Sequence, residues 1–219
     1  MHLGTPNRTG SRLVQSLLRR ERNVCRTILL SRCVQPSRYG CRIGTDASPW
    51  GLGGWLAIDG NTVEYFTSPI SQEDVDKYGF AVGDNKGQQV WEALAILVAV
   101  DLWSRHWKQK RIILKVRSDN VTALVLLIKM RPKSAEDGSS KLAIVARELA
   151  LRLVDLSFPP DAEHTPGMSH VFADLLSRVA APAANKGLDG ILLPDAHPAM
   201  ATATQVDTPT RDSSWYLVK

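Results

Sequence analysis

Four acidic residues could do chemistry together, because each lies beside or within an apolar segment of the chain. They are Asp46 in Gly-Thr-Asp-Ala-Ser, Glu92 in Val-Trp-Glu-Ala-Leu-Ala, Asp119 in Arg-Ser-Asp-Asn, and Asp174 in Ala-Asp-Leu-Leu-Ser-Arg. Clustered carboxylates repel one another and raise one another's pKa. A divalent cation removes that repulsion, and oxygen ligands suit Mg²⁺ or Mn²⁺. The four acids together indicate a divalent-metal site and metal-assisted hydrolysis.

Each acid also has an ordinary structural alternative. Asp46 could close a turn through its own backbone, Asp119 could cap the helix that follows it, and Asp174 could favour a helix dipole. Glu92 is the only charged residue in 89–100, on a predicted helix that is apolar nearly all round. Such a helix is buried, and a buried carboxylate is costly unless a metal ion or an Arg offsets its charge. For Glu92 we favour the ligand role over the salt bridge.

The elements that must position these acids follow from periodicity and turn signals. The pattern predicts strands over 42–47, 51–58, 62–67, 111–116 and 156–164, with an Asp-Gly hairpin turn at 59–60. It predicts helices over 88–107, 121–130, 140–153 and 170–179, and a long polar loop over 68–87. A run of hairpins followed by alternating helices and strands predicts an α/β fold, with a mixed sheet flanked by helices.

Composition divides the chain into three segments. Residues 1–41 form an Arg-rich arm, with eight Arg and one acid within residues 1–40 and one plausible amphipathic helix over 12–30. Such an arm can neutralise nucleic-acid phosphates, and a poorly ordered leader is an equal alternative. Residues 42–178 are the folded domain. The Ala/Pro-rich tail, 179–219, is predicted to be mostly disordered, with a short contact made by 191–193 or 215–217.

Cysteine usage and hydropathy bear on the compartment. Cys25, Cys33 and Cys41 lack zinc-ligand spacing and are expected to be free thiols in a reducing compartment. No apolar run reaches the ~18 residues of a membrane span, and the N-terminal residues lack the apolar stretch of a signal peptide. We expect an intracellular protein, in either the nucleus or the cytoplasm.

The motifs around the acids resemble the ribonuclease H domain, in the form attached to reverse transcriptases of gypsy-like retrotransposons. Thr-Asp-Ala-Ser-Pro-Trp-Gly-Leu-Gly-Gly-Trp-Leu is similar to that family's first hairpin, Trp-Glu-Ala-Leu-Ala-Ile-Leu to its first helix, and Val-Arg-Ser-Asp-Asn to its fourth strand. The run from His164 to Arg178 is similar to its final motif. The resemblance spans 42–178 and implies a ribonuclease H-like fold with a mixed five-stranded sheet, three antiparallel strands being followed by parallel ones.

What the family implies is hydrolysis of the RNA strand of an RNA/DNA hybrid with two Mg²⁺ ions, Mn²⁺ being an alternative. Asp46 would contact both ions, Glu92 and Asp119 would bind the ion on the leaving-group side, and Asp174 the ion that activates water. The resemblance also implies origin in a retroelement polyprotein. A reverse transcriptase is therefore a possible partner, and otherwise we expect a monomer.

The resemblance further implies contacts to the hybrid, which we expect from Ser48, Gly51, Asn120, His164 and His170. The glycines of 51–54 would let a nucleic-acid backbone approach the sheet. His164 lies ahead of Pro-Gly in the final motif, so its equivalence to the auxiliary His of cellular members is open. His170 lies four residues before an acid, on the same helical face, and a plain polar role at the helix start is an equal alternative.

Two other functions compete with the nuclease. One is a catalytically inactive, nucleic-acid-binding remnant of a reverse transcriptase, and the other is a structural partner of a polymerase subunit. The geometry of the acids discriminates among them. Convergence of the carboxylates would favour the enzyme, whereas a Glu92 that points toward an Arg in the core would favour the binding remnant.

Overall fold

A computed structural model describes residues 40–108, 110–130, 139–183 and 197–217. Within them, six strands form one sheet in the order β5-β4-β1-β2-β3-β6. β1, β2 and β3 pair antiparallel, while β4 pairs parallel with β1 and β5 parallel with β4. The predicted α/β class and mixed sheet are confirmed, with antiparallel strands followed by parallel ones. The strands are Cys41–Ala47 (β1), Gly51–Ile58 (β2), Asn61–Pro69 (β3), Leu114–Ser118 (β4), Asp161–His164 (β5) and Thr204–Gln205 (β6).

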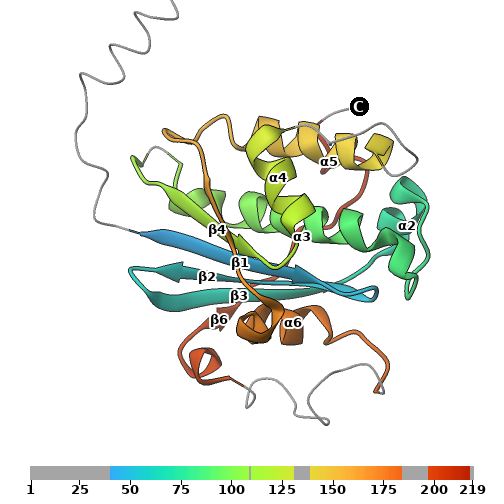
Figure 1. Cartoon of the computed structure of the whole chain (residues 1–219), viewed down its shortest axis with the longest axis horizontal. Coiled ribbons are helices and arrows are strands. Elements are labelled where there is room, and N and C mark those ends of the chain that lie inside the picture. The colour runs from blue at the N-terminus through green and yellow to red at the C-terminus, as the bar shows by residue number, and fades with distance from the viewer. Residues whose placement is uncertain (1–39, 109, 131–138, 184–196, 218–219) are drawn as a thin grey trace, which may run out of the picture. The chain divides into compact units, whose positions relative to one another are not determined.

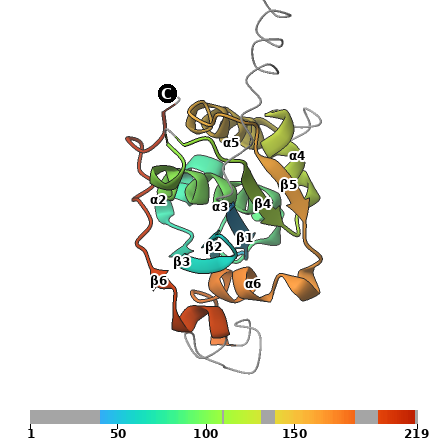
Figure 2. The same ribbon diagram turned by 90° about the vertical axis from the view of Figure 1, so that its left-hand side faces the viewer.

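Helices cover both faces of the sheet (Figures 1 and 2). On one face α3 packs against β1 and β2, and α4 and α5 pack against α3. On the other face α6 packs against β1, β2 and β3. The α-helices are Gln72–Tyr78 (α2), Gln88–Leu102 (α3), Val121–Lys129 (α4), Ser139–Arg152 (α5) and Val171–Ser177 (α6); the 3-10 helices are Asn85–Gly87 (η1), Ser104–His106 (η2), Gly167–Ser169 (η3) and Pro198–Ala201 (η6).

The position of the central helix α3 explains why it is almost entirely apolar. Every residue from Val90 to Val100 is buried, because the sheet lies on one side of α3 and α4 and α5 lie on the other. A helix enclosed in this way has no face in contact with solvent, so it does not need a polar side. The fully buried rings of Trp91, Trp103 and Trp107 extend this core. Glu92 is the one charged residue within the buried run, so its carboxylate is where the structure must provide a compensating partner.

The hairpin between β2 and β3 forms at the predicted turn. Asp59 and Gly60 both have positive φ angles, 52° and 89°. Two-residue hairpin turns with positive φ at both positions favour Asp-Gly, because glycine adopts this conformation without steric cost. The turn brings β3 back along β2, with Asn61 opposite Ile58.

Three elements, β5, α3 and β4, have boundaries that differ from the predicted ones. β5 covers only 161–164 of the predicted 156–164, because Pro159 and Pro160 have no backbone N–H to give to a ladder. The predicted helix over 88–107 ends at Leu102 and continues as the short 3-10 helix η2. β4 begins at Leu114, later than predicted, and extends to Ser118.

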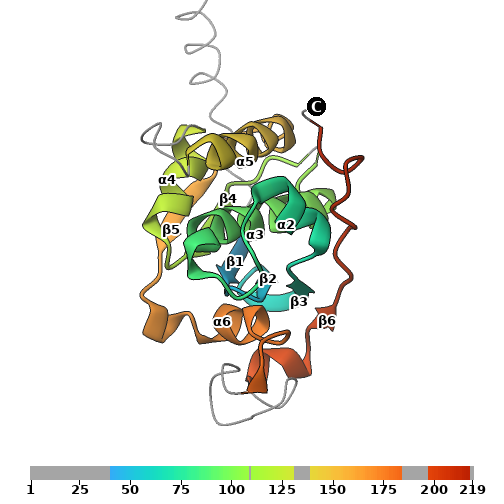
Figure 3. The same ribbon diagram turned by 90° about the vertical axis from the view of Figure 1, so that its right-hand side faces the viewer.

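The predicted loop over 68–87 is wrong for 72–78, which form α2. Ser71 and Asp74 make a capping box: the Ser71 side chain accepts from the Asp74 backbone, and the Asp74 side chain accepts from the Ser71 backbone. The Ser-x-x-acid spacing is a helix-start signal in the sequence. The C-terminal tail runs beside this short helix (Figure 3), and Asp74 pairs with Arg211 of the tail.

The prediction of a mostly disordered tail is wrong for 197–217, which fold back on the domain. β6 pairs with β3 and adds the sixth strand. Arg211 is buried and donates to both oxygens of Asp74 and to Ser68 Oγ. Tyr216 enters the main core, which confirms the predicted contact at 215–217. The alternative contact at 191–193 lies outside the described residues.

Several other predictions also fall outside the described residues: the arm over 1–39 with its helix, and the thiols Cys25 and Cys33. Cys41 is buried and free, and burial raises the pKa of its thiol to about 11. Over the described ranges, no helix combines the length and apolar character that a bilayer span requires.

Candidate metal centre

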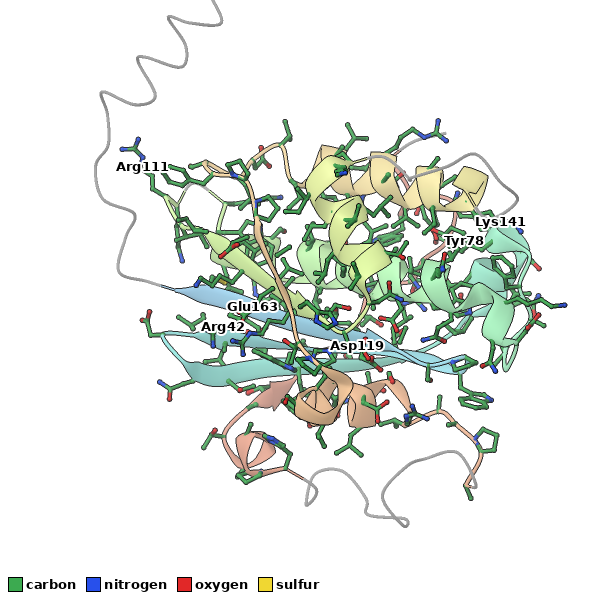
Figure 4. The ribbon with its side chains drawn as sticks, in the orientation of Figure 1. Arg42, Tyr78, Arg111, Asp119, Lys141 and Glu163 are labelled. Atoms are coloured by element: carbon green, nitrogen blue, oxygen red, sulfur yellow. The ribbon has the colours of Figure 1, made fainter. Side chains whose placement is uncertain are left out.

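Three of the four predicted acids converge at the C-terminal ends of the neighbouring strands β1 and β4. One oxygen from each of Asp46, Glu92 and Asp119 lies within 4.8 Å of the others. Gly44 on β1 is opposite Arg117 on the parallel strand β4. Asp46 and Asp119, each two residues further along, therefore lie at the same level. We call these three residues the acidic cluster; Figure 4 labels Asp119, which directly follows the last residue of β4.

Glu92 reaches the acidic cluster from the second turn of α3. Gln88, one turn earlier, donates from Nε2 to Glu92 Oε1 at 2.9 Å and also to the Ala47 carbonyl. This amide ties α3 to the end of β1. Among the described residues no Arg pairs with Glu92. The outcome that would have favoured a binding remnant, a Glu92–Arg pair in the core, is not found in this part of the chain.

Burial controls the electrostatics of the acidic cluster. Asp46 and Glu92 are each 4% exposed. Burial raises the pKa of Asp46 to about 7; a hydrogen bond from Ser177 opposes the rise, and the charges of Asp119 and Asp174 add to it. Burial raises the pKa of Glu92 well above its ordinary value, and the charges of Asp46 and Asp119 raise it further. The charge of Arg178 opposes the rise in the pKa of Asp46, but it is the smallest of these effects.

The acidic cluster fits a hard divalent cation. Glu92 Oε2 is buried and has no hydrogen-bond partner, and leaving a buried polar atom unpaired is costly. Its neighbours are carboxylates, which offer only acceptor atoms when ionised. A cation that binds oxygen ligands would satisfy Oε2 and remove the mutual repulsion.

Asp174, the fourth acid, lies beside the acidic cluster but outside it. It is on α6, which covers the opposite face of the sheet, and its side chain is 38% exposed. Arg178 donates from Nε to Asp174 Oδ1 at 2.6 Å. Asp174 is near enough to raise the pKa of Asp46. The structure therefore places the fourth acid next to Asp46, with an Arg as its present partner.

Two predicted contact residues flank Asp119. Asn120 caps α4, with its side-chain oxygen accepting from Ala123 N at 3.0 Å. The exposed His164 donates from Nε2 to the Asp119 carbonyl oxygen at 3.1 Å. Both side chains are therefore positioned at the rim of the acidic cluster.

The other three predicted contact residues are buried and hold α6 in place. Ser48 is 1% exposed and donates from Oγ to the Ser177 carbonyl at 2.7 Å. His170 donates from Nε2 to the Thr45 carbonyl at 2.7 Å. A Cβ on Gly51 would lie 2.8 Å from the Ser177 carbonyl oxygen. The geometry gives these positions a packing role, and their contact with nucleic acid stays a prediction.

The neighbouring glycines also have packing roles. A Cβ on Gly53 would lie 2.4 Å from the Ser177 nitrogen, and a Cβ on Gly54 would meet the ring of Phe66 at 2.6 Å. The missing side chain at Gly53 lets α6 approach the sheet, and the one at Gly54 makes room for Phe66. Sequence alone could not separate an approaching helix from an approaching ligand, because both require the same absent side chain.

Three residues near the acids were missed by the sequence analysis: Gln88, Ser177 and Arg178. A signal for two of them was present, since Gln88 and Arg178 lie four residues from Glu92 and Asp174 on the same helical faces. Ser177 donates from Oγ to Asp46 Oδ2 at 2.7 Å. No spacing rule predicts that contact, because it joins α6 to β1 across 131 residues of sequence.

Comparison with known proteins gives similarity to solved structures only. No protein-family model and no curated protein matches the chain. A structure of LC11-RNase H1, isolated from compost by a metagenomic approach, has 21% sequence identity and a TM-score of 0.46, covering 64% of this chain and 94% of its own. A second structure, LC11-RNase H1 in complex with an RNA/DNA hybrid, has 21% identity and a TM-score of 0.44, covering 62% and 92%. Similarity at this level leaves the site geometry as the basis for a function.

Proposed function

We propose that this chain is a ribonuclease H-type endonuclease that hydrolyses the RNA strand of RNA/DNA hybrids with Mg²⁺, or with Mn²⁺. The observation that carries the proposal is the acidic cluster: three carboxylates from β1, α3 and the end of β4, with ligand oxygens within 4.8 Å of one another. The fourth acid of the expected set, Asp174, lies near enough to affect the pKa of Asp46.

Each acid has a distinct role in this proposal. Asp46, Glu92 and Asp119 would hold one cation, and Asp46 and Asp174 would hold the other. Such cations would stabilise the charge on both the attacking and the leaving oxygen of an in-line displacement. The water oxygen bonds to phosphorus, the bond from phosphorus to the 3′ oxygen breaks, and a proton passes to that oxygen. The products carry 5′-phosphate and 3′-hydroxyl ends.

The surrounding residues orient these ligands. Gln88 holds one Glu92 oxygen, which leaves Oε2 for a cation. Ordered hydrogen bonds behind metal ligands fix their orientation and are a regular part of metal sites. Burial of Asp46 and Glu92 excludes water from one side of the site and strengthens the electrostatic interactions made there.

Recognition of the hybrid is assigned to the rim of the acidic cluster. His164 is exposed beside Asp119. The Asn120 oxygen is used for capping, so Asn120 would donate to a ligand through its amide nitrogen. A 2′-hydroxyl both donates and accepts hydrogen bonds and is what separates RNA from DNA at such a site. We further infer descent from a retroelement reverse transcriptase; the support is the resemblance of the motifs around the acids.

An end-labelled RNA/DNA hybrid tests the function. The wild-type protein should release RNA fragments with 5′-phosphate ends in Mg²⁺, and Asp46→Asn should cut at least 10²-fold more slowly, since removal of a charge-stabilising group costs about 10²–10³ in rate. Glu73→Gln, which neutralises an exposed acid on α2, is the matched control and should cut normally. If wild type binds the hybrid and cuts neither strand, the chain is the inactive binding remnant.

A further inference from the structure

We infer that Ser177 is a positioning residue that holds the Asp46 carboxylate in its cation-binding orientation, and that docking of α6 on the sheet delivers Ser177 to that place. The inference rests on the proposed function where cleavage of the hybrid is measured. Where cation affinity is measured, it rests only on cation binding. It adds to the proposed site a residue that contacts a ligand of the cation and not the cation itself.

The first support is the contact between Ser177 and Asp46. Ser177, the last residue of α6, is 1% exposed. Its Oγ lies 2.7 Å from Asp46 Oδ2 and 2.9 Å from the Asp174 carbonyl oxygen. A hydroxyl has one proton to donate. With Asp46 ionised, as a cation ligand must be, the proton goes to the carboxylate, because hydrogen bonds to charged acceptors are about twice as strong as neutral ones.

The second support is that the contact with Ser177 restricts rotation of the Asp46 carboxylate. The terminal torsion of an Asp side chain has a broad energy profile, so burial alone does not fix the rotation of the carboxylate. Asp46 takes part in the acidic cluster and also lies beside Asp174. Fixing Oδ2 on Ser177 fixes the plane of the carboxylate, and with it the direction in which the remaining lone pairs point.

The third support is that α6 is docked by contacts separate from the one under test. The last carbonyls of a helix have no partner within the helix. In α6 the Ser177 carbonyl accepts from Ser48 Oγ at 2.7 Å, and the Leu176 carbonyl accepts from Thr67 Oγ1 at 2.9 Å. The missing side chain of Gly53 lets the Ser177 backbone lie directly on β2. The position of the hydroxyl is therefore set by the sheet.

An ordinary explanation for Ser177 is the bond to its own helix. Ser side chains commonly donate to the carbonyl three or four residues earlier, and here that carbonyl belongs to Asp174. That bond predicts a small effect on stability and none on cation affinity. The two explanations therefore differ in a quantity that can be measured without activity.

The experiment is titration of Mn²⁺ and Mg²⁺ into the full-length protein by calorimetry, together with hybrid cleavage over a range of Mg²⁺ concentrations. In Ser177→Ala we expect cation affinity to fall about 10–100-fold, the range found for residues behind metal ligands, with much of the cleavage rate restored by excess Mg²⁺. Thr67→Val removes one α6 docking bond and keeps the shape of the side chain. Because the Ser48 bond and the close approach at Gly53 still hold α6, this variant should lower stability and reduce cation affinity far less than Ser177→Ala does.

Ser177→Cys guards against a folding defect in the Ala variant. Cys is close to Ser in size but is a weak donor, so this variant should fold and still bind cation weakly. The inference is overturned if the Cys or Ala variant binds cation as wild type does, or if Thr67→Val loses as much affinity. It is also overturned if wild type binds no cation. Should wild type bind cation and leave the hybrid intact, the proposed function fails while the comparison of affinities still decides the role of Ser177.

Discussion

Arg178 donates from Nε to Oδ1 of Asp174 at 2.6 Å, one helical turn away on α6. The pair is about one-third exposed on each side, so it contributes little to stability. Its importance is electrostatic: the guanidinium holds an oxygen of the acid that the proposal assigns to the second cation. Arg178 therefore competes with that cation for Asp174.

Replacement of Arg178 tests this competition. Arg178→Gln removes a positive charge close to the site, so we expect the Mg²⁺ concentration that gives half-maximal cleavage to fall several-fold, with the melting temperature nearly unchanged. Arg105→Gln removes an exposed Arg paired with Glu64 and is the control for a change in net charge. An increased Mg²⁺ requirement in Arg178→Gln would instead show that Arg178 orients Asp174 for the cation.

The metal-free protein should lose stability as the pH rises from about 4 to about 7. Burial raises the pKa of Asp46 from 3.8 to about 7, so within that window the folded state binds a proton that the unfolded chain releases. The free energy of unfolding falls with pH wherever the folded state binds more protons. Glu92, whose pKa is also raised, adds to the same slope. Thermal melts in a chelator across this range measure the effect, and Asp46→Asn should flatten the curve; an unchanged slope would contradict the assignment.

Neutral replacement of Glu92 should stabilise the metal-free protein while abolishing its function. Glu92→Gln removes a buried charge whose Oε2 has no partner and keeps the shape of the side chain. We expect the melting temperature in a chelator at pH 8 to rise by a few degrees, which corresponds to roughly 1 kcal/mol. Addition of Mg²⁺ should stabilise wild type and leave this variant unaffected. A lower melting temperature without metal would show that Glu92 is charged and satisfied without a cation.

The tail should be required for stability. Arg211 is buried against Asp74, which is 0% exposed. Arg211→Ala would leave that carboxylate buried and unpaired, a change that costs about 3–5 kcal/mol in buried pairs. Urea unfolding at neutral pH measures the difference. Arg105→Ala, which breaks the exposed pair with Glu64, should cost less than about 1 kcal/mol. Equal effects of the two variants would mean that the tail is not part of the folded unit.

Local patterns in the sequence predicted most elements of the fold. The apolar run of α3 and the Asp-Gly turn formed as predicted, because each depends on residues within one helix or one hairpin. The cap of α4 is Asn120, one residue after the Asp119 that was considered for that role. Four acids were predicted to cluster; Asp46, Glu92 and Asp119 do so, and Asp174 lies outside the group. A strand end and a helix interior place side chains in directions that sequence periodicity already defines.

Contacts between distant segments could be decided only by the tertiary structure. Ser48, Gly51 and His170 were assigned to a ligand, and the structure uses them to dock α6. Arg211 belongs to the tail that was predicted to be mostly disordered, and it is buried against Asp74, a partner 137 residues away in the sequence. A polar side chain or a glycine has the same sequence signature whether it faces a ligand or another part of the chain. Its partner is chosen by packing, which depends on all the elements at once.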